Sequence, residues 1–442
     1  MTEQTKFSHS VTLDVDKCMG CTTCIRHCPM EAIRVRDGKA CITTERCIDC
    51  GECIRVCPHK AKQAVFDKWE DNAGRFKYRV ALPAPTLYGQ FNNLDDVDYV
   101  LTGLRRFGFD MVFEVSRAAE IISDYTRKLI STGGLVTPVI SSACPAVVRL
   151  IRARFPHLCE HVLPIRAPIH LAAAIARREA MERSGLPSED IGIFFISPCP
   201  AKMTDVKLPL GLEHTDVDCV LSISDIYKDL LKQMNKLTEP EMISRSGLLG
   251  IGWATSGGES AGLLEEKYLA ADGIDQVIKV LEELEDEKLG DLEFIELNAC
   301  PGGCVGGAAA VENPFVAKAR IQMLRKYLPV SRNKFTERDM DELHMDWSFP
   351  LQYSPDAPLS ENMTEAMQKM QRIEQIAATF PGLDCGACGA PSCRALAEDI
   401  VRGNANRTDC LFILKKRLEE LFGEVRGGTA PPSPERTGGK KQ

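Results

Sequence analysis

The sequence predicts an α/β core with a small cysteine-rich α+β domain before it and a small helical cysteine-rich domain after it. Between about residues 79 and 330, apolar runs alternate with amphipathic stretches, which is typical of a largely parallel sheet covered by helices. Cysteines are dense on either side of that region. At 442 residues the chain is also too long for one compact core, which favours several domains.

The N-terminal domain is predicted to span residues 1–78 and contains an internal repeat, CMGCTTCIRHCP and CIDCGECIRVCP. This spacing resembles bacterial ferredoxins with two clusters, in which the fourth cysteine of each copy ligates the other cluster. The resemblance implies two 4Fe-4S clusters, one held by Cys18, Cys21, Cys24 and Cys57, the other by Cys47, Cys50, Cys53 and Cys28. A zinc ribbon is the alternative, but it closes one tetrahedral site with only two cysteine pairs.

The overall composition excludes several functions. The chain has 54 basic and 62 acidic residues and a net charge of -8, which argues against a nucleic-acid partner. No apolar run approaches a membrane span, and the N-terminus MTEQTKFSHS has no signal-peptide pattern. We therefore expect a cytoplasmic protein whose 19 cysteines stay reduced and serve to bind metal rather than form disulfides.

The central domain, predicted to span residues 79–330, is expected to alternate strands with helices. Strands are expected at 78–82, 111–115, 136–140, 191–196 and 217–221. Helical patterns lie between them, for example at 94–106, 146–155, 167–183 and 224–234. Functional sites of such parallel sheets lie at the strand ends, where we expect the four further cysteines of this region.

These four cysteines are Cys144 in SSACPAVV, Cys199 in ISPCPAK, and Cys300 and Cys304 in ELNACPGGCVGG. Four thiolates are what one more cubic cluster requires. The spacing of Cys300 and Cys304 predicts a helical turn with both sulfurs on one face, and a helix N-terminus there would favour an anionic cluster. The neighbouring glycines allow the backbone to approach a bulky cofactor closely.

The three segments resemble the signature motifs of FeFe hydrogenases, in the family's order and over roughly residues 79–330. In that family a 4Fe-4S cube shares one cysteine with a di-iron unit bearing carbonyl, cyanide and a bridging dithiolate, together called the H-cluster. The resemblance implies that the four cysteines bind the cube, with Cys304 bridging to the di-iron unit. It also implies that Lys202 donates to one cyanide and that Pro85 and Thr86 lie near the other.

An ordinary cube without a di-iron unit is the alternative, as in the hydrogenase-like cluster-assembly proteins of eukaryotes. Retention of Lys202 and of the glycine pattern around Cys304 argues against that loss.

Several positions depart from the family's pattern. The residue before the first cube-binding cysteine relays protons as a cysteine in catalytic members and is Ala143 here, so the usual proton path is broken. Ser197 and Asn298 stand where methionines pack around the subsite, and Ile169 replaces a glutamine. Asp205 keeps the acidic type three residues beyond the lysine. These changes are expected to alter the polarity and potential of the site.

An alternative proton path needs other carboxylates. Glu259 in TSGGES and Glu296 just before the third motif are the best-placed candidates. Both could equally be surface acids or helix caps.

After the core, a connector is predicted at 331–362, a C-terminal domain at 363–425 and a disordered tail at 426–442. The C-terminal domain has helical patterns at 364–378 and 411–422, and its motif FPGLDCGACGAPSC resembles the small 4Fe-4S domain of corrinoid iron-sulfur proteins. The resemblance implies one more cluster, with zinc as the alternative, held by Cys385, Cys388, Cys393 and Cys410. The remaining thiols are expected to be buried or idle, and they are Cys41, Cys159 and Cys219.

The resemblance implies an enzyme that exchanges H2 with two protons and two electrons and uses its clusters as a wire. The domain order and Ala143 resemble the sensory FeFe hydrogenases that lack a PAS domain, so we expect slow turnover in a hydrogen-sensing role. A catalytic, ferredoxin-linked hydrogenase is the second interpretation, and a non-enzymatic cluster carrier or assembly factor is the third. The expected partners are H2 and protons, a redox or signalling protein, and the proteins that mature the H-cluster.

Overall fold

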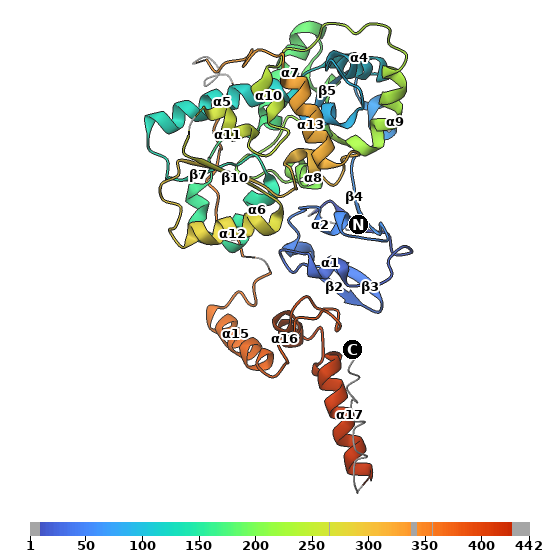
Figure 1. Cartoon of the computed structure of the whole chain (residues 1–442), viewed down its shortest axis with the longest axis vertical. Helices are drawn as coiled ribbons and strands as arrows, with labels where there is room; N and C mark the ends of the chain where they lie inside the picture. The colour runs from blue at the N-terminus through green and yellow to red at the C-terminus, as the bar shows by residue number, and fades with distance from the viewer. Residues whose placement is uncertain (1–8, 265, 337–342, 356, 427–442) are drawn as a thin grey trace, which may run out of the picture.

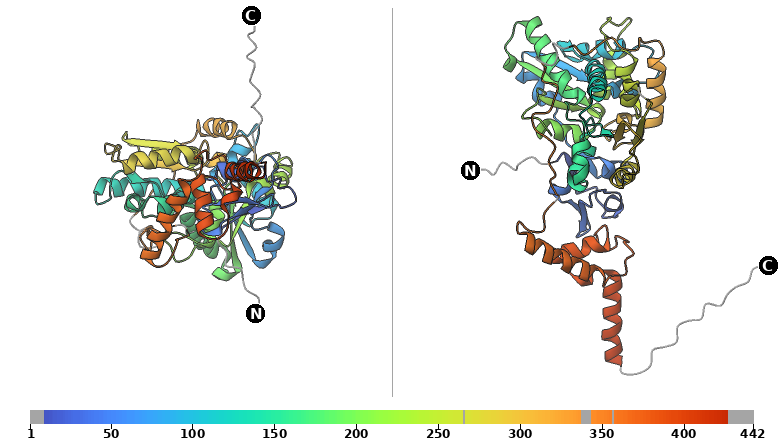
Figure 2. Two further views of the ribbon diagram at one scale, coloured as in Figure 1. Left: turned by 90° about the horizontal axis from the view of Figure 1, so that it is seen from below. Right: turned by 90° about the vertical axis from the view of Figure 1, so that its left-hand side faces the viewer.

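The structure is a computed structural model of the chain, and it describes residues 9–264, 266–336, 343–355 and 357–426. Three parts follow one another along its longest axis (Figure 1): the α/β core, the N-terminal domain below it, and the C-terminal domain beyond that. The last helix, α17 (Leu411–Arg426), projects away from the rest, as a view turned by 90° also shows (Figure 2). Within the described ranges, no helix is long and apolar enough to cross a membrane.

The N-terminal domain has two short antiparallel pairs of strands and two short helices, each of which contains the third cysteine of its cysteine run. One pair is β1 (Val11–Leu13) with β4 (Lys62–Ala64), and the other is β2 (Ile33–Arg36) with β3 (Lys39–Ile42). The helices are α1 (Thr23–Arg26) and α2 (Glu52–Arg55). Several cysteines belong to the small core of this domain, so metal ligands and packing residues share the same interior.

The first sheet of the core is entirely parallel and has the order β6-β5-β8-β9. Alternate residues of a strand point to opposite faces, so Val80 and Leu82 belong to one apolar cluster and Ala81 to the other. Helices cover both faces, which explains the almost uninterrupted apolar sequence of β8. The strands are β5 (Tyr78–Pro83), β6 (Met111–Val112), β8 (Ile191–Ser197) and β9 (Cys219–Ser222). The covering helices are α5 (Val115–Thr132) and α7 (Pro168–Ser184) on one face, and α4 (Asp98–Phe107) and α9 (Ile223–Met234) on the other.

The second sheet is also parallel and has the order β10-β11-β7. Its strands are β7 (Val139–Ile140), β10 (Tyr268–Asp272) and β11 (Phe294–Asn298). Two helices pack on it, α6 (Pro145–Arg154) and α12 (Ile274–Glu285). Cys144 and Cys300 follow the carboxyl ends of β7 and β11, while Cys199 follows that of β8 in the other sheet.

The predicted fold class of the core is confirmed, and most predicted elements lie within a few residues of the observed ones. The strand predicted at 111–115 is too long, because it ends at Val112 and α5 begins at Val115. The sequence analysis did not identify α5, β10 or β11, nor α13 (Pro314–Arg325).

Contacts with the core come from the first described parts of the predicted connector, whereas Ala357 and Leu359 near its end contact the C-terminal domain. The buried Glu120 carboxylate on α5 accepts hydrogen bonds from the backbone N–H groups of Arg332 and Asn333, at 2.9 and 2.8 Å. The Trp347 N–H donates to the carbonyl of Pro164. In the C-terminal domain, α15 (Met363–Ala377) packs against α16 (Cys393–Val401). Apart from Arg426, where α17 ends, the predicted tail lies outside the described residues.

Candidate functional site

The cysteines of the two small domains gather in the sets that the sequence predicts. Cys18, Cys21, Cys24 and Cys57 line one hollow of the N-terminal domain. Cys28, Cys47, Cys50 and Cys53 line another. Cys385, Cys388, Cys393 and Cys410 line a hollow of the C-terminal domain. The chemistry of these donor sets fits iron-sulfur clusters, and metal ligation by the individual residues stays a prediction.

The fourth set lies in the core, where two of its members stand at helix N-termini. Cys144 directly precedes α6 and Cys199 precedes α8 (Pro200–Lys207), and each helix begins with a proline. Burial, together with the smaller effect of the nearby Cys300 and Cys304, raises the pKa of the Cys144 thiol to about 11. Burial also raises the pKa of Cys199 and Cys300. Buried thiols of this kind stay neutral unless a metal compensates the charge of the thiolates.

The predicted helical turn between Cys300 and Cys304 is wrong. Gly302 and Gly303 have φ values of 78° and 92°, in the left-handed region, and only the short 3-10 segment η6 (Cys304–Gly306) follows. A Cβ atom on Gly303 would lie 2.4 Å from the Ser256 backbone nitrogen, so the two chain segments are as close as glycine allows. Helix N-termini do point at this site, but they belong to α6 and α8.

A pocket opens beside Cys304. Its empty space is about 610 Å³, including the solvent at its open mouth. The residues singled out from the sequence that line it are Pro85, Thr86, Ala143, Ile169, Lys202, Glu259, Glu296, Asn298 and Cys304. Much of the apolar wall of the pocket was not predicted from the sequence, and it includes Val115, Ala119, Phe195 and Trp253. Val115 and Ala119 lie on α5, Phe195 lies on β8, and Trp253 directly follows α10 (Leu248–Gly252), so short-range sequence patterns gave no signal for them.

Two singled-out residues lie elsewhere. The Ser197 hydroxyl accepts a hydrogen bond from the Cys199 N–H at 3.1 Å and is not part of the pocket lining, contrary to its predicted cofactor-binding position. As the last residue of β8, it shapes the turn into Cys199 instead. The Asp205 carboxylate is 2.8 Å from Nε2 of the buried His170.

The polar lining of the pocket includes the Lys202 ammonium and the Thr86 hydroxyl. The Lys202 Nζ lies 3.7 Å from the Cys304 Sγ. Burial alone would lower the pKa of Lys202, but the neighbouring thiolates raise it above its usual value, so the side chain is an ammonium. The Thr86 hydroxyl is fully buried and has no hydrogen-bond partner within the described part of the chain. An ammonium and an orphaned hydroxyl on one pocket fit a bound group with small polar ligands.

The two candidate carboxylates are buried, which rules out surface acids. Glu296 does cap a helix, because it accepts hydrogen bonds from the N–H groups of Gly257 and Ser260 at the start of α11 (Gly258–Leu263). Asn298 also donates to it, at 2.9 Å. Glu259 accepts one hydrogen bond from the Ser141 hydroxyl, at 2.6 Å. Burial and the charge of Glu296 raise the pKa of Glu259 to about 8. Glu259 is therefore the less constrained of the two carboxylates.

Arg55, which the sequence analysis missed, connects the N-terminal domain to the core. It stands at the end of α2, and its guanidinium donates to the Cys50 carbonyl at 3.1 Å and to the Cys300 Sγ at 3.5 Å. Burial lowers its pKa, but the Cys300 thiolate raises it above the usual value. Arg55 could have been noticed in the sequence, because both copies of the repeat continue with Ile-Arg after the third cysteine.

The three leftover cysteines lie outside these four groups. Cys41 is exposed on β3, Cys159 is half-buried, and Cys219 is buried in β9. Their placement agrees with the expectation of buried or idle thiols.

Three family profiles match the chain. A profile described as the iron only hydrogenase large subunit, C-terminal domain, matches residues 77–268 and 250–308. A 4Fe-4S dicluster domain matches residues 10–58, and a putative Fe-S cluster profile matches residues 380–412. Iron-sulfur clusters are thus cofactors of the matched families in all three parts of the chain.

Among individual proteins, the periplasmic Fe hydrogenase large subunit of Nitratidesulfovibrio vulgaris is 26% identical over 375 residues, 70% of this chain and 88% of its own length. Iron hydrogenase 1 of Clostridium pasteurianum is 23% identical over 52% of this chain and 50% of its own length. A Caenorhabditis elegans protein named probable cytosolic Fe-S cluster assembly factor is 22% identical over 47% of this chain and 56% of its own length. The chain thus spans about half the length of the latter two.

Among solved structures, an FeFe-hydrogenase of Chlamydomonas reinhardtii aligns with 61% of this chain and 94% of its own, at 16% identity and a TM-score of 0.46.

Replacing Gly303 by alanine is expected to destabilise the core by at least about 2 kcal/mol, because the new methyl group meets backbone and the φ value disfavours it. The thermal midpoint and the iron content of the purified protein should both fall. Gly302→Ala has the same type of φ value, but its Cβ would make only ordinary van der Waals contacts, at 3.6 Å or more, so it should be milder. Gly290→Ala, in open space, is the control, and equal midpoints for all three variants would contradict the steric argument.

Proposed function

Because the chain belongs to the iron-only hydrogenase large-subunit family, whose profile spans residues 77–308, we propose that it exchanges H2 with protons and electrons at an H-cluster. The proposed ligands of this cluster are Cys144, Cys199, Cys300 and Cys304. When bound, the di-iron unit supplies the interconversion of H2 with two protons and two electrons. The observation that carries the proposal is the pocket beside Cys304, on which the Lys202 ammonium and the unpartnered Thr86 hydroxyl both lie.

The chain's own residues would serve this chemistry in three ways. Lys202 and Thr86 would orient the di-iron unit by donating hydrogen bonds to its cyanide ligands. The apolar wall with Phe195 and Trp253 would keep water from the reacting atoms. Two ferredoxin-type clusters in the N-terminal domain would carry the electrons, with Arg55 close to both Cys50 and Cys300.

We further propose low turnover in a hydrogen-sensing role. Ala143 lines the pocket. Its methyl group has no titratable proton to pass on, which supports slow proton exchange. A sensor needs occupancy of its site rather than flux, and its signal would leave through a redox or signalling partner. A catalytic, ferredoxin-linked hydrogenase is the alternative, and the cytoplasmic location and the need for maturation proteins stay predictions.

For the remaining proton movement we propose a path through Glu259. Its carboxyl lies on the pocket, and burial together with the neighbouring charge of Glu296 raises its pKa, which favours the protonated form. The Ser141 hydroxyl donates to Glu259, and the Ala143 N–H donates to the Ser141 oxygen at 3.2 Å. The exchangeable proton of the Ser141 hydroxyl would therefore lie next to Ala143, where catalytic members of the family have a proton-relay cysteine.

One comparison favours a second candidate function. The similarity to a protein named as a cluster assembly factor is compatible with a cube that lacks a di-iron unit and does no hydrogen chemistry.

Infrared spectroscopy of the matured protein tests the proposed function against this candidate. Carbonyl and cyanide stretching bands are expected, since only the di-iron unit carries such ligands. The same chain prepared without the maturation proteins is the control and should lack the bands. Absence of bands from a matured sample with a full cube would contradict the proposal and favour the assembly factor.

The variant Ala143→Cys is expected to raise the rate of H2 evolution by about 100-fold, the usual contribution of a positioned acid-base group. Ala119→Cys is the matched control, because Ala119 lies on another part of the same pocket wall. Both rates are measured with a soluble dye as electron donor. If Ala143→Cys is no faster than the control, the slow-sensor proposal loses its basis.

Replacing Glu259 by glutamine is expected to slow H2 evolution by about 100-fold, because the amide keeps the hydrogen bond but not the acid. The protonated carboxyl persists up to about pH 8, so the native rate should fall as the pH rises through that value. The pH dependence should vanish in the variant. Glu296→Gln should also slow the reaction, and the exposed Glu182→Gln is the control. Native rates in both Glu259→Gln and Glu296→Gln would rule out this path.

A further inference from the structure

The two copies of the N-terminal repeat reach the two neighbouring domains with equivalent arginines. Arg55 follows Cys53 in the second copy and donates to the Cys300 Sγ in the core. Arg26 follows Cys24 in the first copy and donates to the Cys385 carbonyl in the C-terminal domain, at 2.8 Å. In each copy, the arginine two residues after the third cysteine thus contacts a cysteine of another domain.

The C-terminal cysteine loop lies directly against β2 of the N-terminal domain. The Val35 N–H donates to the Gly389 carbonyl at 2.8 Å, and the Arg36 guanidinium donates to the Cys388 carbonyl at 3.0 Å. A Cβ atom on Gly389 would lie 2.0 Å from the Val35 carbonyl oxygen, so glycine alone allows this approach. The loop is therefore fitted to the strand rather than loosely attached to it.

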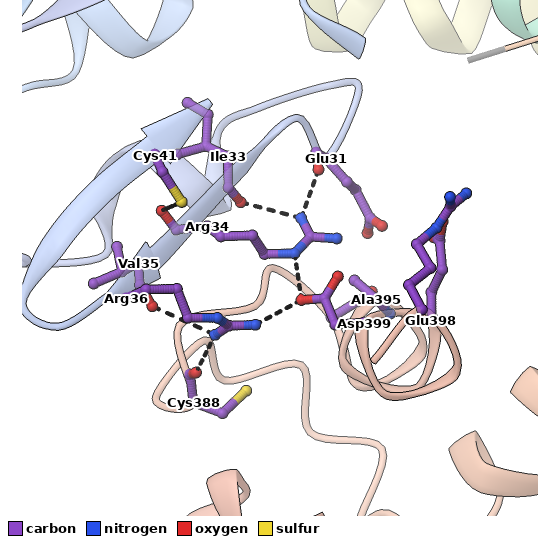
Figure 3. Close-up of polar contacts among 12 residues, drawn as sticks. Glu31, Ile33, Arg34, Val35, Arg36, Cys41, Cys388, Ala395, Glu398 and Asp399 are labelled. Atoms are coloured by element: carbon purple, nitrogen blue, oxygen red, sulfur yellow. Dashed lines mark hydrogen bonds and ion pairs between the residues drawn. The ribbon is translucent and has the colours of Figure 1, made fainter. Parts of the chain in front are cut away.

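A shared carboxylate holds the two domains together (Figure 3). The Asp399 carboxylate on α16 accepts from Arg34 Nε at 2.7 Å and from Arg36 Nη2 at 2.6 Å. Arg34 and Asp399 are both buried, so removing the Asp399 carboxylate would leave the buried charge of Arg34 without this partner. Beside them, Arg46 forms an ion pair with Glu398. Burial would raise the pKa of Glu398, but Arg46 and Arg402 outweigh it and hold the pKa below its usual value.

The docked loop lies next to one particular cysteine set of the N-terminal domain. A Cβ atom on Gly386 would lie 3.3 Å from the Ile25 side chain, and Ile25 directly follows Cys24. Val35, which binds Gly389, lines the hollow of the Cys18 set. The Cys47 set faces the core instead, where Gly51 approaches Ala308 and Pro200.

We propose that Arg34, Arg36 and Asp399 are positioning residues that hold the C-terminal cluster beside the cluster of the Cys18 set, as the terminal member of a linear electron path. The inference rests on the iron-sulfur loading in the proposed function. Electrons pass singly between the two clusters, so one is oxidised as the other is reduced, and no bond forms or breaks. The path then runs from the core through the Cys47 set and the Cys18 set to the C-terminal domain.

Electron paramagnetic resonance of the full holoprotein, reduced with dithionite, tests this arrangement. In the native protein, magnetic coupling to the Cys18 cluster should broaden the signal of the C-terminal cluster. Asp399→Asn is expected to abolish the broadening while the iron content per chain stays unchanged. Asp399→Glu, which keeps the charge, should restore it. Glu374→Gln is the control, because it removes an exposed ion pair within the same domain.

A second pair of variants identifies the neighbour. Cys21→Ser disturbs the Cys18 set and should remove the broadening, whereas Cys47→Ser should leave it. If Asp399→Asn loses iron, the double variant Arg34→Gln/Arg36→Gln replaces it in the test. Its changes break the same contact from the N-terminal domain and leave the C-terminal domain unaltered. Unchanged broadening in that double variant, or loss of broadening in Cys47→Ser alone, would overturn the proposal. Dithionite reduction needs neither H2 nor a di-iron unit, so the result is independent of the infrared test.

Discussion

The structure depends on bringing four thiols together in each of several buried places. Thiolates repel one another and lose hydration when buried, and burial raises the pKa of Cys144, Cys199 and Cys300. Metal binding compensates this cost, but only if the backbone holds the sulfurs in position without it. In the core, this is achieved by strand ends, by two proline-initiated helices and by the left-handed turn at Gly303.

The pocket beside Cys304 shows how charge is balanced once the thiols are in place. Lys202 lies on the cysteine side and is held as an ammonium by the thiolates. Glu259 and Glu296 lie on the same pocket, and burial keeps a proton on Glu259. Ala143 lines the same pocket and adds no titratable group to it. The proposed slow turnover rests on this combination of an ammonium, two buried carboxyls and an alanine.

The cysteine motifs were recognisable in the sequence because the spacing within each motif is local, and the resemblance to known families supplied the grouping of distant cysteines into sets. The alternation of apolar runs predicted the parallel core. Features that depend on backbone reversal or on distant segments were not predicted. Two glycines with positive φ replace the expected turn between Cys300 and Cys304. Helix α5 was missed because the apolar residues at its start were assigned to a strand. The capping role of Glu296 required knowing that α11 lies beside β11.

The repeated arginines give the two ends of the N-terminal domain different electrostatics despite their equivalence in sequence. Arg55 is half-buried, pairs with Glu52 at 2.8 Å and contacts the Cys300 thiol, so the part of its positive charge that Glu52 does not offset would favour an electron on the proposed core cluster. Arg26 is exposed and contacts only a carbonyl, where water weakens its effect. The first copy therefore cannot hold its neighbour through this arginine alone. The buried Asp399 contact supplies the missing attachment, which explains why two arginines of β2 converge on one carboxylate at that end and not at the other.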